Sequence, residues 1–180
     1  MHGSIFLLLK RYVQTTYDHS TWLKLLDVSG LSGQDFDHKE VYPDAHIYAL
    51  VGSAARMTGI PAETLQEKFG EYLVPDLMHM YAKLVEPGWR TLEMIEHTER
   101  VMHKRVREEH AENAPPVLDV RRLGPNELLI DYVSGRRMSA LAVGIVRGLA
   151  TYFDEAEQIT VEPTTREDGR HVQIRVTRRT

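Results

Sequence analysis

Three polar side chains occupy alternate positions near the end of the segment LLIDYVSGRR, residues 128–137. If this segment is a β-strand, Tyr132, Ser134 and Arg136 point to the same face, because successive strand side chains alternate between faces. Two hydroxyl groups and a guanidinium would then face one place, and arginine forms paired hydrogen bonds with carboxylates and phosphates. The spacing therefore predicts an anion-binding group. The alternative is a solvated strand face that runs into a turn.

His103 is the candidate metal ligand. It lies three residues before Val106, beside the apolar stripe of a long helix predicted over residues 91–112. A neutral imidazole on such a face is a good iron ligand, although a core histidine with a satisfied hydrogen bond shows the same pattern. His110 competes from a polar segment near the end of the helix, and His97 points to a different face.

Other common chemistries lack their residues. The chain has no cysteine, so disulfides and thiolate metal ligands are excluded. Among the nine histidines no two stand four residues apart, which is the spacing that places two zinc ligands on one helical face. The sequence also has no glycine-rich phosphate loop and no Gly-x-Ser-x-Gly nucleophile turn. We therefore do not expect an enzyme.

The composition is that of a globular domain. Of the 180 residues 42% are hydrophobic and 27% are charged, and the formal net charge of -4 gives no reason to expect nucleic-acid binding. The N-terminal apolar run stops at Lys10 and Arg11, which is too short for a membrane span, and no small-residue cleavage site follows it. We expect a cytoplasmic protein that does not bind membranes.

Hydrophobic periodicity predicts an α+β fold: a helical N-terminal two-thirds followed by a four-stranded antiparallel sheet with an inserted helix. The predicted helices cover residues 2–17, 22–26, 43–57, 61–84 with a kink or restart at Pro75, 91–112 and 138–153. The predicted strands cover residues 117–123, 128–134, 158–163 and 171–178. They form two hairpins, the second with its turn at Asp168 and Gly169. Gly144 and Gly148 in the inserted helix allow close helix packing.

With these residues in place, the sequence resembles the heme nitric oxide/oxygen binding (H-NOX) domain. This is the sensor module of soluble guanylate cyclases and of bacterial signalling proteins. The similarity covers essentially the whole chain. It is carried by the opening MHGSIF followed by YV, by FGEYL at residues 69–73, by His103 late on a long helix, by Pro116 thirteen residues later, and by the Tyr-x-Ser-x-Arg pattern of Tyr132, Ser134 and Arg136.

The resemblance implies a single heme-based gas-sensor domain over residues 1–180, with a helical subdomain at about residues 1–60 and heme b buried between the two parts. In this interpretation His103 binds the iron. The implied cofactor contacts are Tyr132, Ser134 and Arg136 on the two propionates, Pro116 against the porphyrin, and Ile5, Leu9, Leu73 and Leu141 along the apolar pocket.

The resemblance also implies a function. The protein would bind nitric oxide and carbon monoxide, and nitric oxide would weaken or break the bond between iron and His103. A histidine kinase or a cyclic-di-nucleotide enzyme would receive the signal in trans. Dioxygen would form no stable complex, because Leu141 stands five residues after Arg136, where dioxygen-binding members of the family have a tyrosine.

A second hypothesis keeps the fold without the cofactor. The residues just before His103, IEHTER, are more charged than the apolar run usual in the family, and they include Glu96 and Glu99. In this hypothesis the chain is a regulatory interaction module that binds no heme or binds another ligand. One observation separates the two hypotheses, since a heme protein is red and has a strong Soret absorption.

Overall fold

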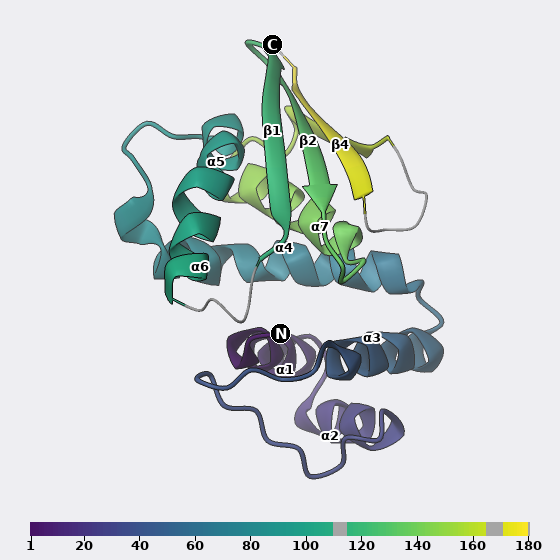
Figure 1. Cartoon of the computed structure of the whole chain (residues 1–180). Helices are drawn as coiled ribbons and strands as arrows, with labels where there is room; N and C mark the ends of the chain where they lie inside the picture. Colours follow the sequence, from purple (N-terminus) through teal and green to yellow (C-terminus); the bar gives the residue numbers. More distant parts are fainter. Residues whose placement is uncertain (110–114, 165–170, 180) are drawn as a thin grey trace. The chain divides into compact units, whose positions relative to one another are not determined.

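The chain folds into two compact units, residues 1–69 and residues 70–180. The structure is a computed structural model that describes residues 1–109, 115–164 and 171–179 (Figure 1). Within these ranges, no helix has both the length and the apolar character needed to cross a membrane.

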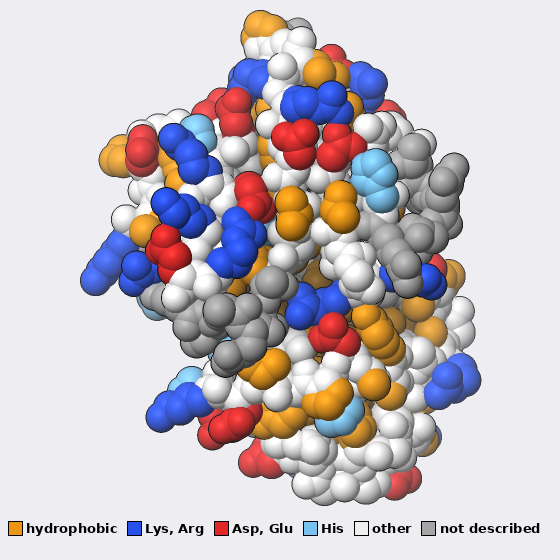
Figure 2. Space-filling model, in the orientation of Figure 1, with side chains coloured by type: hydrophobic (Ala, Val, Ile, Leu, Met, Phe, Trp, Pro, Cys, Tyr) orange, Lys and Arg blue, Asp and Glu red, His pale blue; other side chains and the backbone are white. Residues whose placement is uncertain are grey.

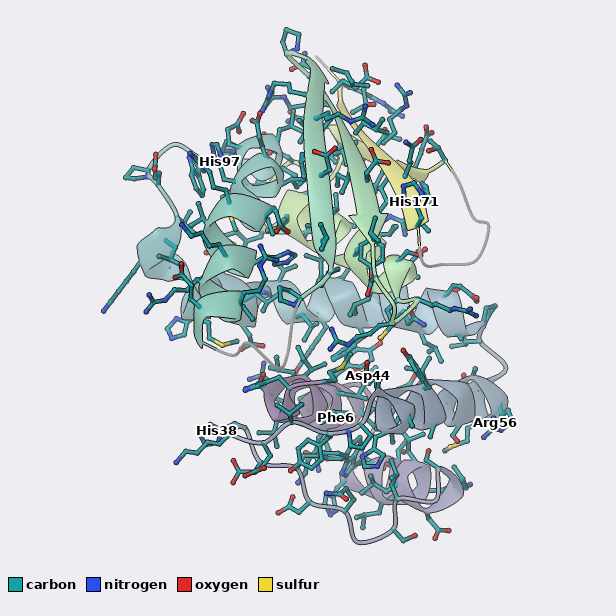
Figure 3. All side chains as sticks on the ribbon, viewed as in Figure 1. Phe6, His38, Asp44, Arg56, His97 and His171 are labelled. Carbon is teal, nitrogen blue, oxygen red and sulfur yellow. The ribbon has the colours of Figure 1, made fainter. Side chains whose placement is uncertain are left out.

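The first unit is helical. It contains α1 (Gly3–Thr16), α2 (His19–Val28), α3 (Asp44–Thr58) and the beginning of α4 (Ala62–Met80). α1 buries Phe6, Leu9 and Val13, whose spacing places them on one helical face. Phe6, which is labelled in Figure 3, stacks on Phe36 with the ring centroids 4.4 Å apart. The first three predicted helices are confirmed.

α4 continues into the second unit. It runs through Pro75 to Met80 as one helix, so it does not restart at the proline. A short 3-10 turn, η1 (Ala82–Leu84), follows before the next helix begins at Thr91.

The rest of the second unit is built on an antiparallel sheet. Its strands are β1 (Val117–Gly124), β2 (Glu127–Val133), β3 (Ile159–Pro163) and β4 (His171–Arg178), in the order β1-β2-β4-β3. α5 (Thr91–His97) contacts β1 and β2, and α7 (Ser139–Tyr152) contacts α5 and β3. Both predicted hairpin pairings and the inserted helix are confirmed, and so is the α+β class. The turn predicted at Asp168 and Gly169 lies outside the described residues.

Alternation gives the sheet one apolar and one polar face. β2 buries Leu128, Ile130 and Tyr132, and the first two belong to a core that α5 and α7 share. On the other face Asp131 accepts a hydrogen bond from Gln173 at 2.8 Å. Figure 2 shows acidic and basic side chains side by side over this part of the molecule. The helices therefore cover the apolar face, and the polar face meets solvent.

α4 and α7 approach so closely that glycines are required where they cross. A Cβ atom on Gly70 would lie 2.8 Å from the backbone nitrogen of Ile145 and would collide with the carbonyl oxygen of Leu141. A Cβ atom on Gly148 would lie 2.6 Å from Cγ2 of Val74. The close packing predicted for the inserted helix is confirmed at Gly148.

We expect Gly70→Ala to lower the free energy of unfolding by about 1–3 kcal/mol, because the added methyl group must displace the backbone of α7. Gly52→Ala in α3 is the matched control. Its Cβ atom would meet only the guanidinium of Arg56, at 3.6 Å, and alanine is the better helix former by roughly 0.5–1 kcal/mol. Urea denaturation measures both effects, and unchanged stability of Gly70→Ala would contradict the close approach.

Candidate functional site

The segment that carries His103 is not a uniform α-helix. α5 passes into a π-helical turn, η2 (Thr98–His103), and then into α6 (Lys104–Glu109). The regular helix predicted over residues 91–112 is therefore wrong in its middle, and its end lies outside the described residues. A π turn widens the helix and is frequent at functional sites. His103 is the last residue of this turn.

The predicted apolar stripe of this segment is largely confirmed. Leu92, Ile95 and Met102 are buried, and Val106 is half-buried. His103 follows Met102 in the chain, and its side chain is only 17% exposed. His103 is therefore placed at the edge of the apolar core, as its position beside the stripe predicted.

Glu99 is the partner of His103. Its Oε2 atom lies 2.9 Å from Nδ1 of His103 and accepts a second hydrogen bond from the backbone N–H of Leu118 at 3.2 Å. Arg107 donates to the other carboxylate oxygen, Oε1. The Glu99 side chain is 24% exposed, so this carboxylate is a partly buried ion that η2, α6 and β1 together supply with donors.

The protonation states follow from these contacts. Burial lowers the pKa of the His103 imidazole more than the hydrogen bond and the charge of Glu99 raise it, which favours the neutral ring at pH 7. Burial raises the pKa of the Glu99 carboxyl, but the hydrogen bonds from His103, Arg107 and Leu118 bring it below its ordinary value. An ionised carboxylate can only accept, so Nδ1 of His103 carries the proton and Nε2 keeps a lone pair.

The neighbouring Glu96 has a different partner. Its carboxylate lies 2.8 Å from the guanidinium of Arg122 on β1, and Arg122 also contacts Glu93. The hydrogen bond from Arg122 is the main cause that lowers the pKa of Glu96. Of these two carboxylates in the charged run before His103, only Glu99 contacts His103.

A buried carboxylate fixes the start of the same segment. Glu155, whose side chain is 6% exposed, accepts a hydrogen bond from the backbone N–H of Thr91 at 3.0 Å and lies 3.6 Å from both Arg90 and Arg178. Burial raises the pKa of this carboxyl, but the bonds from Thr91 and the two guanidinium charges lower it overall. The first turn of α5 is thereby tied to the end of β4.

His97, the other described histidine of this segment, does not share the arrangement. His97, labelled in Figure 3, lies on α5 with its ring centroid 4.6 Å from that of Trp89. Its Nδ1 atom lies 3.3 Å from Arg100, which matches the prediction that it points elsewhere. His110, the competing ligand, lies outside the described residues.

The polar group at the end of β2 is arranged differently from its prediction. Tyr132 is in the strand and only 3% exposed, but the strand ends at Val133. Ser134 and Arg136 therefore lie in the connection to α7, where Oγ of Ser134 accepts a hydrogen bond from the backbone N–H of Arg136 at 3.2 Å. The expectation that one strand face carries all three side chains is wrong, because the turn begins too early, although the three remain close in the chain.

The sheet register connects this group with His103. Leu118, which donates to Glu99, is the β1 residue paired with Tyr132 of β2. The pair Leu118–Tyr132 therefore links the group around His103 to the polar group at the end of β2. Pro116, two residues before Leu118, is half-buried at the entry to β1.

The candidate apolar residues lie on three helices. Leu73 is buried in α4, and Leu141 is half-buried in α7, with its carbonyl group against Gly70. Ile5 and Leu9 lie on α1 in the first unit, where Ile5 is half-buried and Leu9 is buried. Leu9 also lines an apolar cavity of about 220 Å³ within that unit.

Sequence inspection missed the role of Arg107 and the specific contact of Glu99. The available signal was spacing: Glu99, His103 and Arg107 stand four residues apart in the order acid, histidine, base. Side chains at that spacing are neighbours on a helical surface. Within the described ranges no three His, Asp or Glu side chains are grouped so as to hold a metal ion by themselves. A single neutral histidine suits a metal that brings its other ligands with it, as a porphyrin does.

Comparison with known proteins finds relatives along the whole chain. A family model described as Haem-NO-binding matches residues 2–162. An H-NOX protein from S. oneidensis, solved in the Fe(II)NO ligation state, has a TM-score of 0.89 and 21% sequence identity, with 100% of both chains covered. An Fe(II) unliganded H-NOX protein from K. algicida has a TM-score of 0.84 and 19% identity, covering 100% of this chain and 97% of that one. No curated protein matches the chain.

Proposed function

Since the chain belongs to the haem-NO-binding (H-NOX) family of heme-based gas-sensor domains, we propose that it binds nitric oxide and carbon monoxide at a heme ligated by His103. We further propose that it signals in trans to a histidine kinase or a cyclic-di-nucleotide enzyme. Heme is the cofactor of the family. The observation that carries the proposal is a largely buried imidazole whose Nδ1 lies 2.9 Å from the carboxylate of Glu99. A histidine held in this way presents Nε2 to a metal.

The residues present fit a heme. A heme has an apolar body and two carboxylates at one edge, and carboxylates drawn inside a protein need charge-assisted hydrogen bonds. Tyr132, Ser134 and Arg136 supply two hydroxyl groups and a guanidinium around the end of β2, and we assign the propionates to them. The proposed apolar contacts are Leu73, Leu141, Pro116, Ile5 and Leu9.

We propose that His103 passes a change at the cofactor to the protein. When bound, heme would supply the iron at which a diatomic gas binds. A change in the force on His103 acts on Glu99, and through Glu99 on Leu118 of β1 and Arg107 of α6. Signalling requires two packings of this segment with different affinities for the gas. In this proposal the π turn between α5 and α6 is the element at which the packings differ.

The reduced, heme-loaded protein should bind nitric oxide and carbon monoxide and should form no stable dioxygen complex in air. Leu73 and Leu141 carry no hydrogen-bond donor, and the missing charge-assisted bond corresponds to about 1.5–3 kcal/mol, roughly 10- to 150-fold in affinity. Soret and visible spectra under each gas measure this. A stable dioxygen spectrum would contradict the gas preference, and a chain that stays colourless with added heme would support the heme-free module.

His103→Gly should be purified without heme, and added imidazole should restore heme binding, because free imidazole can occupy the vacated ligand position. The ratio of Soret to protein absorption measures the heme content. His97→Ala is the control and should keep its heme, since His97 packs on Trp89. If His103→Gly keeps an unchanged ferrous spectrum while His110→Ala loses heme, the ligand assignment is wrong.

Arg136→Ala should release heme faster, because each charge-assisted hydrogen bond to a propionate contributes about 1.5–3 kcal/mol. Arg136→Lys should restore retention only in part, since an ammonium cannot form the paired bonds of a guanidinium. Transfer of heme to an excess of a heme-free acceptor protein gives the rate. Arg137→Ala is the matched control, because Arg137 is the exposed neighbour. Equal rates for Arg136→Ala and Arg137→Ala would remove Arg136 from the proposed site.

A further inference from the structure

In the function proposed so far, the carboxylate of Glu99 only passes a change at His103 to Leu118 and Arg107. The same carboxylate also has three hydrogen-bond donors. Oε2 accepts hydrogen bonds from Nδ1 of His103 at 2.9 Å and from the backbone N–H of Leu118 at 3.2 Å. Oε1 accepts a hydrogen bond from the guanidinium of Arg107. These donors come from three elements, so the position of the carboxylate is fixed from three directions. A carboxylate fixed in this way in turn fixes the imidazole ring.

We propose that Glu99 is a positioning residue that makes His103 a stronger donor to iron than a histidine with a neutral partner would be. The proposal rests on the proposed function, since it assumes that His103 is the ligand. A carboxylate that accepts from the second nitrogen of a ligating imidazole fixes the tautomer and the ring orientation and raises the basicity of the first nitrogen. In this chain those effects act on Nε2 of His103.

A stronger bond to His103 would change the gas response. If nitric oxide weakens the bond between iron and His103, as the family resemblance implies, a more basic imidazole would be released less readily. Arg107 limits the effect, because its positive charge on Oε1 draws charge away from Oε2. Two opposing effects therefore act on His103. The carboxylate of Glu99 raises the basicity of Nε2, and the guanidinium of Arg107 reduces that increase.

A purely structural role for Glu99 makes a different prediction. In that case Glu99 only joins the π turn to β1 through Leu118. Removal of its charge would then lower the free energy of unfolding and leave the electronic properties of the heme unchanged. Spectroscopic and redox measurements therefore decide between the two roles, and stability measurements alone do not.

The experiment compares the wild-type chain, Glu99→Gln and the matched control Glu96→Gln, all loaded with heme. Glu96 lies on the same helical segment but pairs with Arg122. In Glu99→Gln the iron–histidine stretching frequency of the reduced protein should fall, and the midpoint potential should rise because a weaker donor stabilises ferric iron less. Heme affinity should fall by roughly 10- to 100-fold. Glu96→Gln should match the wild type in all three.

A second measurement covers the case in which Glu99→Gln does not retain heme. Nitrogen chemical shifts of His103 in the heme-free full-length chain report which ring nitrogen carries the proton. The wild type should have it on Nδ1, and Glu99→Leu should show the ordinary mixture of tautomers. An unchanged stretching frequency and potential in Glu99→Gln would overturn this proposal and leave the proposed function standing. A wild-type His103 without the Nδ1 proton would do the same. A wild-type chain that takes up no heme would instead overturn the proposed function, and this proposal with it.

Discussion

The group around His103 depends on one requirement: a largely buried imidazole must stay neutral and keep one orientation. Burial disfavours the charged ring, and a neutral ring has one N–H group and one lone pair, so its surroundings must choose between two tautomers. Glu99 selects the tautomer with the proton on Nδ1, because its carboxylate accepts a hydrogen bond from that nitrogen. As a partly buried ion it then needs donors of its own, which Leu118 and Arg107 provide. A single histidine therefore dictates residues in η2, α6 and β1.

These distances hold only if the surrounding frame does not move. The first turn of α5 is fixed by Glu155, which accepts from Thr91. The register of the sheet sets Leu118 opposite Tyr132, so the group around His103 and the hydroxyl and guanidinium group after β2 share one pair of strand residues. Because strand pairing is shifted only in whole residues, a change in register would separate Glu99 from its backbone donor.

Sequence patterns were sufficient where local structure follows from periodicity. The alternating burial of β2 and β4 and the apolar stripe through Leu92 and Ile95 were predictable, since each reflects one repeating geometry. The π turn was not, because it leaves the types of residue on the stripe unchanged. The end of β2 at Val133 was also missed, since period-two spacing continues through Arg136 into the turn.

The charged run before His103 shows why residue type alone misleads. As a string, IEHTER suggests carboxylates placed next to an apolar pocket, where an unpaired charge would oppose binding of an apolar cofactor. In the fold each carboxylate has a partner of opposite charge or a hydrogen-bond donor. Glu96 pairs with Arg122 on β1, and Glu99 joins His103 to Arg107. The two side chains stand three residues apart, so a regular helix would set them on one face. Their partners nevertheless differ: Glu96 lies in α5 and pairs with a strand, whereas Glu99 lies within the π turn and joins His103 of that turn to Arg107 of α6.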